Sequence, residues 1–221
     1  LIIKSIAFSS VAEAGIPINN KGKVLLDAIP WYDHRTQSIR NDLSNTLVEK
    51  FIYKNTGLAN NHFYSAYKIL WVKKYKPKIY KKIYKWLPIN DFIAWKFTGV
   101  ISTDFSQAMR TMLFDPQKMN WSKKMIEKTK INKNILPKLV SAGEKKGLIK
   151  QKFKKILFLK NECVVGTGGH DDVIATFAMQ GFKKNIAVNS LGSAEGIFVN
   201  TNKFERKAVL NKSKFISGVF Q

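Results

Sequence analysis

Apolar and polar residues follow the short period of strands in some segments of this chain and the longer period of helices in others. Residues 1–9 and 16–29 fit strands, and the turn residues at 19–22 predict that 16–18 and 24–29 form a hairpin. Further strands are predicted at 155–159, 163–165, 186–190 and 196–199. The last two fit a second hairpin, which has small residues at its tip.

Helical spacing of apolar residues predicts several helices between these strands. One helix is expected from 36 to 54, and Gly57 should terminate it. Others are expected at 65–74, at 78–84, from a capping Asp91 through Trp95 to Gly99, and from Asn120 or Ser122 onward. The basic segment 144–155 is expected to be a solvated part of the surface.

Residues 164–172 carry the most informative local pattern, with the sequence Val-Val-Gly-Thr-Gly-Gly-His-Asp-Asp. The pattern predicts a short buried strand, a glycine-rich turn and a helix from Asp172 to Gly181. A carboxylate at a helix start accepts backbone N–H bonds and is held rigidly, and the glycines let the backbone approach a ligand. Such a carboxylate suits a general base. Taken alone, the segment favours an ordinary capping aspartate, because these are far commoner than catalytic ones.

Composition indicates a globular protein. The 221 residues are 45% hydrophobic and 12% aromatic, which suits one sizeable core or one domain and part of another. The single cysteine, Cys163, lies in an apolar run and is expected in the core, so no disulfide framework exists. No apolar run approaches the roughly 20 residues that span a bilayer, and the first residues lack the features of a signal peptide. We therefore expect a cytoplasmic protein without a membrane partner.

The formal net charge of +23 raises the alternative of a non-enzymatic basic module that binds nucleic acid. Four of the 38 basic residues are arginine, namely Arg35, Arg40, Arg110 and Arg206. Proteins that read nucleic acids favour arginine for bidentate contacts, and here the lysines are scattered along predicted helices. The charge is therefore better explained as a compositional bias of solvated faces, and we expect no specific nucleic-acid partner.

Four blocks, in order along the chain, resemble the FGGY family of carbohydrate kinases. Residues 28–36 contain a Trp-x-Asp-x-Arg element, and 63–72 resemble the family's first signature. Residues 87–115 contain the third block. The Gly-Gly-His-Asp sequence at 168–171, followed by Asn-Ser-Leu-Gly-Ser-Ala at 189–194, forms the fourth. Each block alone is a weak or moderate signal, but their shared order across the chain is strong.

The resemblance implies an α/β fold of the actin-like ATPase (ribonuclease H-like) type, a mixed sheet with flanking helices, in which sugar and ATP meet between two domains. Residues 1–184 would form the sugar-binding N-terminal domain without its first strands, and 185–221 the first hairpin of the nucleotide-binding C-terminal domain. The fold would be incomplete at both ends, because an Asp-x-Gly-Thr-Thr element before Leu1 and most of the nucleotide domain after Gln221 are expected. The chain alone would then be inactive.

The resemblance also assigns the chemistry, with ATP and Mg²⁺ as cofactors and no metal ligand specified. Asp171 matches the catalytic aspartate of the family's Gly-x-Asp element and would be the base. Asp172 competes by spacing, but it is expected to cap the helix or to contact the sugar. Gly192 and Ser193 match a phosphate-binding element whose backbone N–H groups would hold the transferred phosphate. From the residues alone, a plain hairpin turn is the stronger interpretation of that pair.

Sugar binding needs a planar apolar wall and fixed polar groups, which Trp31, Asp33 and Arg35 supply within five residues. A core tryptophan beside a surface Asp–Arg pair is an equal alternative. Further candidate sugar contacts are Glu13, Phe63, His170 and Asp172. A core aromatic at the helix start is an equal alternative for Phe63, and a turn histidine with a satisfied hydrogen bond is the commoner outcome for His170. The expected partners are a sugar or polyol and ATP, and self-association into a homo-oligomer stays open.

Overall fold

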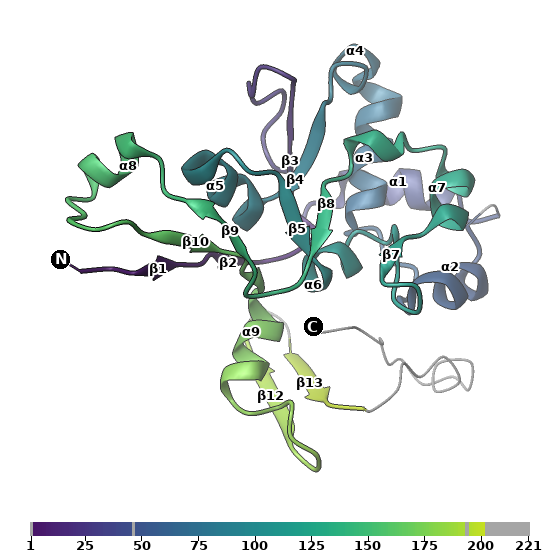
Figure 1. The fold of residues 1–221 in the computed structure, drawn as a ribbon. Coiled ribbons are helices and arrows are strands. Elements are labelled where there is room, and N and C mark those ends of the chain that lie inside the picture. The colour runs from purple at the N-terminus through teal and green to yellow at the C-terminus, as the bar shows by residue number, and fades with distance from the viewer. Residues whose placement is uncertain (1, 46, 193–194, 202–221) are drawn as a thin grey trace.

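The computed structural model describes residues 2–45, 47–192 and 195–201. Short strands and helices alternate along a mixed α/β fold, and the helix-rich part lies on one side of the strands (Figure 1). Near the end of the described chain, a helix and a hairpin project away from the rest of the molecule (Figure 1). Two hydrophobic cores stabilise the larger part, and the projecting elements lie beside the candidate site.

The largest sheet has three strands in the order β1 (Ser5–Ile6), β10 (Val164–Gly166) and β9 (Lys145–Leu148). β1 runs parallel to β10, and β9 is antiparallel to it, so the sheet is mixed as expected. Helix α5 (Ile89–Thr98) packs against β9 and β10. The smaller core lies here and consists of Ala94, Ile149, Leu159, Cys163 and Val165. The prediction that Cys163 is a core residue is therefore confirmed.

Strand β2 (Ser9–Ser10) pairs in parallel with β11 (Gly169–His170), a strand that the sequence pattern did not predict. The backbones approach each other closely here. A Cβ atom on Gly168 would lie 1.7 Å from the carbonyl oxygen of Phe8, so only glycine fits at this position. The glycine-rich turn therefore serves first to bring these two strands together.

The larger core surrounds α3 (Ser65–Tyr75), which the sequence predicted almost to the residue. The single helix expected at 36–54 is wrong. The chain forms η1 (His34–Thr36), α1 (Gln37–Asp42) and α2 (Glu49–Thr56), and Gly57, with a φ of 74°, ends α2 as predicted. Leu47, between α1 and α2, is fully buried in the core. Tertiary burial therefore interrupts a pattern that is helical in the sequence.

The prediction of the first hairpin is correct for the turn at 19–22 and wrong for the strand pairing. Strand β3 (Gly15–Ile18) pairs with β4 (Lys85–Pro88), not with residues 24–29, of which Val24 forms an isolated bridge to Ile18. β4 supplies Trp86 and Leu87, which are both almost completely buried. The preceding helix α4 (Pro77–Tyr80) is shorter than expected because the chain turns into this strand.

The central part of the chain holds a second parallel pair, β5 (Ser102–Asp104) with β8 (Lys138–Val140). The short helix α6 (Phe105–Met109) follows β5 directly. Next come the antiparallel pair β6 (Phe114–Asp115) and β7 (Asn120–Trp121), helix α7 (Lys123–Thr129) and η2 (Lys133–Ile135). Ser122 caps α7, as predicted, by accepting the N–H of Met125 at 3.4 Å.

Two expectations about charged segments are wrong. Asp91 does not cap α5 but lies in its first turn, where it forms a fully buried ion pair with Lys146. Segment 144–155 is therefore not simply solvated, because β9 carries Lys146 into the interior. Helix α8 (Gln151–Ile156) begins in the same segment and extends into the strand expected at 155–159.

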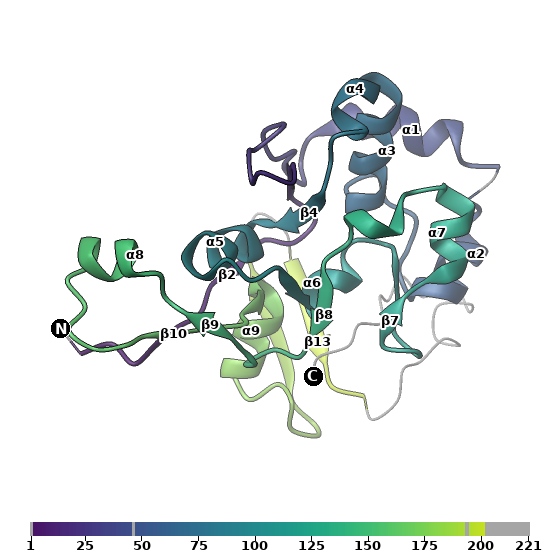
Figure 2. The same cartoon turned by 45° about the horizontal axis from the view of Figure 1, so that its top comes forward.

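The projecting elements are α9 (Asp171–Ala178) and the hairpin of β12 (Ala187–Leu191) with β13 (Glu195–Val199), which confirms the second predicted hairpin. The expected helix extended to Gly181, so α9 ends three residues early. The hairpin lies alongside α9 in both views (Figures 1 and 2). Within the part of the chain that the structure describes, no helix has the length and apolarity required to cross a bilayer.

Candidate functional site

The candidate site lies where the parallel strands β2 and β11 end. β2 leads through Val11 and Ala12 to Glu13, and β11 leads directly to Asp171 at the start of α9. In α/β proteins, ligands bind beyond the carboxyl ends of such strands. The pairing thus brings together a sugar-contact candidate and the base candidate, which are far apart in the sequence.

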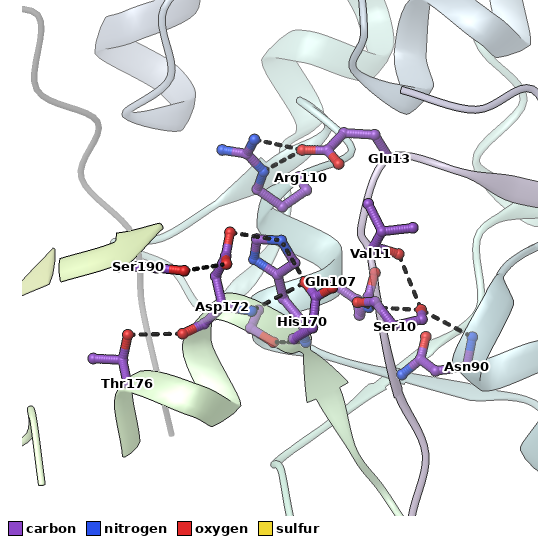
Figure 3. A network of polar contacts seen from close by, with 12 residues as sticks. Ser10, Val11, Glu13, Asn90, Gln107, Arg110, His170, Asp172, Thr176 and Ser190 are labelled. Carbon is purple, nitrogen blue, oxygen red and sulfur yellow. Dashed lines mark hydrogen bonds and ion pairs between the residues drawn. The ribbon is translucent and has the colours of Figure 1, made fainter. Parts of the chain in front are cut away.

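Glu13 is held tightly from several sides. Its backbone φ is 61°, and the residue is 5% exposed. The carboxylate forms an ion pair with the Arg110 guanidinium, as Figure 3 shows. Its carbonyl oxygen accepts a hydrogen bond from the Ser65 hydroxyl at 2.8 Å and another from the Lys68 ammonium at 3.1 Å. These contacts fix the loop after β2 in one conformation.

Arg110 is a site residue that the sequence analysis missed. Its guanidinium lies over the rings of Phe63 and Tyr64, 5.7 Å and 5.2 Å from their centroids, in cation–π geometry. In this structure Phe63 therefore packs against the Arg110 guanidinium. One signal in the sequence could have identified Arg110, because an arginine in a chain that otherwise uses lysine indicates a requirement for the guanidinium fork.

Lys68 is buried and faces the same loop. Burial lowers the pKa of its ammonium to about 8, while the charges of Glu13 and Asp33 act in the opposite direction. Lys68 belongs to segment 63–72, which resembles the family's first signature. The structure adds a specific contact, because the ammonium joins α3 to the Glu13 carbonyl.

Asp33 and Arg35 form a local pair. The Asp33 carboxylate accepts hydrogen bonds from the Arg35 backbone N–H and Nε, both at 2.9 Å, and these contacts hold the pKa of Asp33 below its usual value. The Arg35 guanidinium lies 5.1 Å from the centroid of the Trp71 ring. Trp31 is half-buried and packs edge-on against Tyr32. The local Asp–Arg pair is thus present, and the Lys68 charge acts on both Asp33 and Glu13.

Asp171 and Asp172 occupy the first turn of α9. The Asp171 side chain is 50% exposed, and its Oδ1 atom lies 3.3 Å from Nε2 of His170 and accepts the Asp172 N–H at 3.0 Å. Asp172 does not cap the helix, because His170 occupies the capping position. Its Oδ1 atom accepts the Ser190 hydroxyl at 3.2 Å, which ties α9 to β12 (Figure 3).

His170 lies at the centre of the site. Burial and the neighbouring Arg110 charge lower the pKa of its imidazole, although Glu13, Asp171 and Asp172 act in the opposite direction. A neutral imidazole suits a position between a guanidinium and two carboxylates, because it can donate from one ring nitrogen and accept at the other. His170 therefore contacts the two acids and lies close enough to Glu13 and Arg110 for their charges to act on it.

The same three residues could hold a cation. His170, Asp171 and Asp172 each offer one ligand atom, and these atoms lie within 4.8 Å of one another. Carboxylate oxygens suit Mg²⁺, which prefers hard oxygen ligands and keeps several waters. The exposed carboxylates of Asp171 and Asp172 therefore fit the magnesium that the family resemblance implies, whereas the imidazole nitrogen does not.

One of the two phosphate-binding candidates lies at the end of β12. Gly192 follows β12 and is exposed, whereas Ser193 lies outside the described residues. The role of this pair remains a prediction.

The fold is that of carbohydrate kinases, in the actin-like ATPase class. The structure superposes on a gluconate kinase from Lactobacillus acidophilus with a TM-score of 0.84 and 25% identity, covering 89% of this chain and 40% of that one. A glycerol kinase from Plasmodium falciparum, solved with ADP, gives a TM-score of 0.80 and 29% identity over the same shares.

Sequence comparison agrees with the structural comparison. Residues 2–178 match the N-terminal domain of the FGGY family of carbohydrate kinases, so the chain belongs to this family. Relatives include a xylulose kinase from Lactococcus lactis, 29% identical over 87% of this chain and 38% of that protein. An L-fuculokinase from Escherichia coli is 27% identical over 90% of this chain and 42% of that protein. The chain thus spans less than half the length of these relatives.

Proposed function

We propose that this chain forms the sugar-binding part of an ATP-dependent carbohydrate kinase, with Asp171 as the general base. The observation that carries the proposal is the placement of Asp171. It is a half-exposed carboxylate in the first turn of α9, and it contacts His170, whose pKa is shifted by the charges of Arg110 and Glu13. Family membership supports phosphoryl transfer to an alcohol as the reaction class.

Phosphoryl transfer requires a positioned hydroxyl and an acceptor for its proton. In our proposal, Asp171 accepts the proton as the hydroxyl oxygen bonds to the γ-phosphorus and the bond from that phosphorus to the bridging oxygen breaks. ADP leaves with the electron pair of the broken bond. Bound Mg²⁺ would neutralise charge on the phosphates, and the Asp172 carboxylate, which is not the proposed base, could help to hold it.

The sugar or polyol would lie between Asp171 and the Glu13 loop. Trp31 would supply the apolar wall, and Glu13, Asp33 and Asp172 would accept hydrogen bonds from hydroxyl groups. Contacts from Arg35, Phe63 and His170 remain part of the proposal. The named relatives include kinases for xylulose, fuculose, glycerol and gluconate, so a panel of such substrates is the appropriate screen.

We further propose that residues 1–184 belong to the sugar-binding domain and that 185–221 begin the nucleotide-binding domain. The hydrogen bond from the Ser190 hydroxyl to Asp172 would then join the hairpin to α9, the helix that carries Asp171. Backbone N–H groups of Gly192 and Ser193 would contact the transferred phosphate. Use of ATP and the single free cysteine suit a cytoplasmic location.

The decisive experiment is a coupled kinase assay on the longest natural polypeptide that contains these 221 residues. Pentuloses, hexuloses, polyols and sugar acids are screened with Mg-ATP. Asp171→Asn should lower kcat by about 10³-fold, within the usual range for a general base, and should change the sugar KM little. Asp172→Asn distinguishes the competing acid, and Asp42→Asn, at a remote exposed pair with Lys74, is the matched control. Full turnover by Asp171→Asn would refute the assignment.

A parallel assay uses the 221-residue chain itself. We expect weak sugar binding and no ATP turnover, because the chain spans about two-fifths of its relatives and the proposed nucleotide-binding part is represented by one described hairpin. Calorimetry with Mg-ATP measures binding, and the coupled assay measures turnover. ATP-dependent phosphorylation of any sugar by this chain would contradict the expectation.

A further inference from the structure

We propose that Ser106 is a positioning residue for Asp171, acting through the backbone of His170. This inference rests on the proposed role of Asp171 as the base. It concerns a residue that does not touch the proposed substrate and that lies in helix α6, outside the strand–turn–helix segment that carries the acids.

The contact is a buried hydrogen bond between distant parts of the chain. The Ser106 hydroxyl oxygen accepts the N–H of His170 at 2.9 Å, and these residues are 64 positions apart in the sequence. Ser106 is 3% exposed and His170 is 7% exposed. Since water is excluded, the His170 N–H would lose its partner if the hydroxyl were removed.

Asp104 sets the direction of this bond. Its carboxylate caps α6 by accepting the backbone N–H of Ser106 at 2.7 Å and that of Gln107 at 3.3 Å. The same carboxylate accepts a hydrogen bond from the Ser106 hydroxyl. A carboxylate accepts and does not donate, so the single proton of the hydroxyl points to Asp104 and its lone pairs remain for His170.

The packing leaves the β11 backbone little room to move. A Cβ atom on Gly169 would lie 2.9 Å from the Ser106 hydroxyl oxygen and 3.2 Å from Cδ1 of Ile174. Asp171 directly follows His170, so the position of the His170 backbone determines the position of the Asp171 backbone and of its carboxylate. A displacement of about 1 Å at a reacting group can cost on the order of 100-fold in rate.

Helix α6 also holds the sugar side of the site. The Gln107 side-chain amide donates to the carbonyl of Ser10 on β2 at 3.2 Å, and Arg110 at the helix end forms the ion pair with Glu13. Figure 3 shows Gln107 and Arg110 reaching these partners beside His170. Helix α6 therefore contacts both β2 and β11. The hydrogen bond of Ser106 is the contact made to the residue next to Asp171.

The test combines kinetics with amide hydrogen exchange on the longest natural polypeptide that contains this chain. Ser106→Ala should lower kcat about 10- to 100-fold, since it displaces the base, and should leave the sugar KM within about threefold. Exchange of the His170 amide, followed by NMR, should accelerate about fivefold or more, because its hydrogen bond is lost.

Ser122→Ala is the matched control. Ser122 is also a buried serine that receives a backbone N–H at a helix start, but it caps α7, in the larger core. It should lose similar stability without changing kcat or the exchange of His170. Both variants are assayed at a temperature at which thermal melting shows each to be folded.

The outcomes separate this inference from the proposed function. If Asp171→Asn is inactive and Ser106→Ala retains the kcat of the unmodified protein, the positioning role is refuted while the base assignment stands. If Asp171→Asn remains active, the base assignment fails, and with it the positioning role. Equal losses of kcat in Ser106→Ala and Ser122→Ala would show a general effect of stability and would also refute the positioning role.

Discussion

Arg110 forms an ion pair with Glu13 and so connects the end of α6 to the loop that follows β2. The Glu13 side chain is 4% exposed, and that of Arg110 is 21% exposed. A carboxylate buried to this extent needs a charged partner, because desolvation without one is costly. The pair therefore stabilises the loop that the proposed substrate would contact.

Removing the guanidinium should destabilise the fold and the sugar site together. Arg110→Met leaves the Glu13 carboxylate buried without its cation, so we expect a loss of about 3 kcal/mol in the free energy of unfolding. Urea denaturation measures the loss, and calorimetry measures weaker sugar binding. Lys74→Met, which removes the exposed partner of Asp42, is the control and should change stability little. Equal effects of the two substitutions would contradict the prediction.

The buried pair of Lys146 and Asp91 should behave as a unit. Both side chains are 1% exposed, and the ammonium also donates to the Ser102 carbonyl at 2.8 Å. Lys146→Met should cost about 3–5 kcal/mol, because it leaves a buried carboxylate uncompensated. Adding Asp91→Leu should restore part of the loss. A double variant no more stable than the single one, in urea denaturation, would argue against this account.

Close contact of two backbones should make Gly168 sensitive to a single methyl group. Gly168→Ala places a Cβ against the carbonyl oxygen of Phe8, and we expect a loss of about 1–3 kcal/mol or more. Gly166→Ala is the matched control in the same segment, because its Cβ would meet its nearest atoms at 3.9 Å. Thermal melting compares the two variants. Similar melting temperatures would show that β2 and β11 are not in such close contact.

Stability should depend on pH through Asp104. Burial, together with the nearby Asp91 carboxylate, raises the pKa of its carboxyl from 3.8 to about 6, although hydrogen bonds from Ser106 and Gln107 act in the opposite direction. A raised pKa means that the folded protein binds the proton more tightly than the unfolded chain. This contribution to stability is therefore full below pH 3.8 and is lost as the pH rises to about 6.

Asp104→Asn should remove this dependence. The difference in unfolding free energy between the variant and the unmodified protein should change by about 3 kcal/mol across the window. Comparing the two proteins cancels the contribution of His170, whose pKa is lowered by groups other than Asp104. Urea denaturation at a series of pH values measures the difference. A constant difference across the window would contradict the raised pKa.

Nucleic-acid binding should be weak despite the net charge of +23. We expect association with duplex or single-stranded nucleic acid at low salt alone, with a steep salt dependence and no sequence preference. Fluorescence anisotropy at several salt concentrations checks this expectation. Sub-micromolar affinity for one sequence at physiological salt would favour the basic binding module instead.

The sequence by itself determined the features that depend on residues close together along the chain. Gly57 ends α2, Ser122 caps α7, and the strand, turn and helix around Asp171 occur in the predicted order. The second hairpin also forms as predicted. Each of these features depends on local backbone conformation and on hydrogen bonds between near neighbours, which local residue types specify.

Tertiary structure decided the partners of distant residues. Arg110 and Glu13 are 97 positions apart, and Lys146 and Asp91 are 55 apart. β3 pairs with β4 and not with segment 24–29, which is nearer in the sequence. The burial of Leu47 lies within the interruption of a segment whose sequence pattern is helical. Local periodicity is the same whichever partner is chosen. The choice depends on which arrangement buries the apolar surface of the whole chain while pairing each buried charge, and that balance is settled only in the folded molecule.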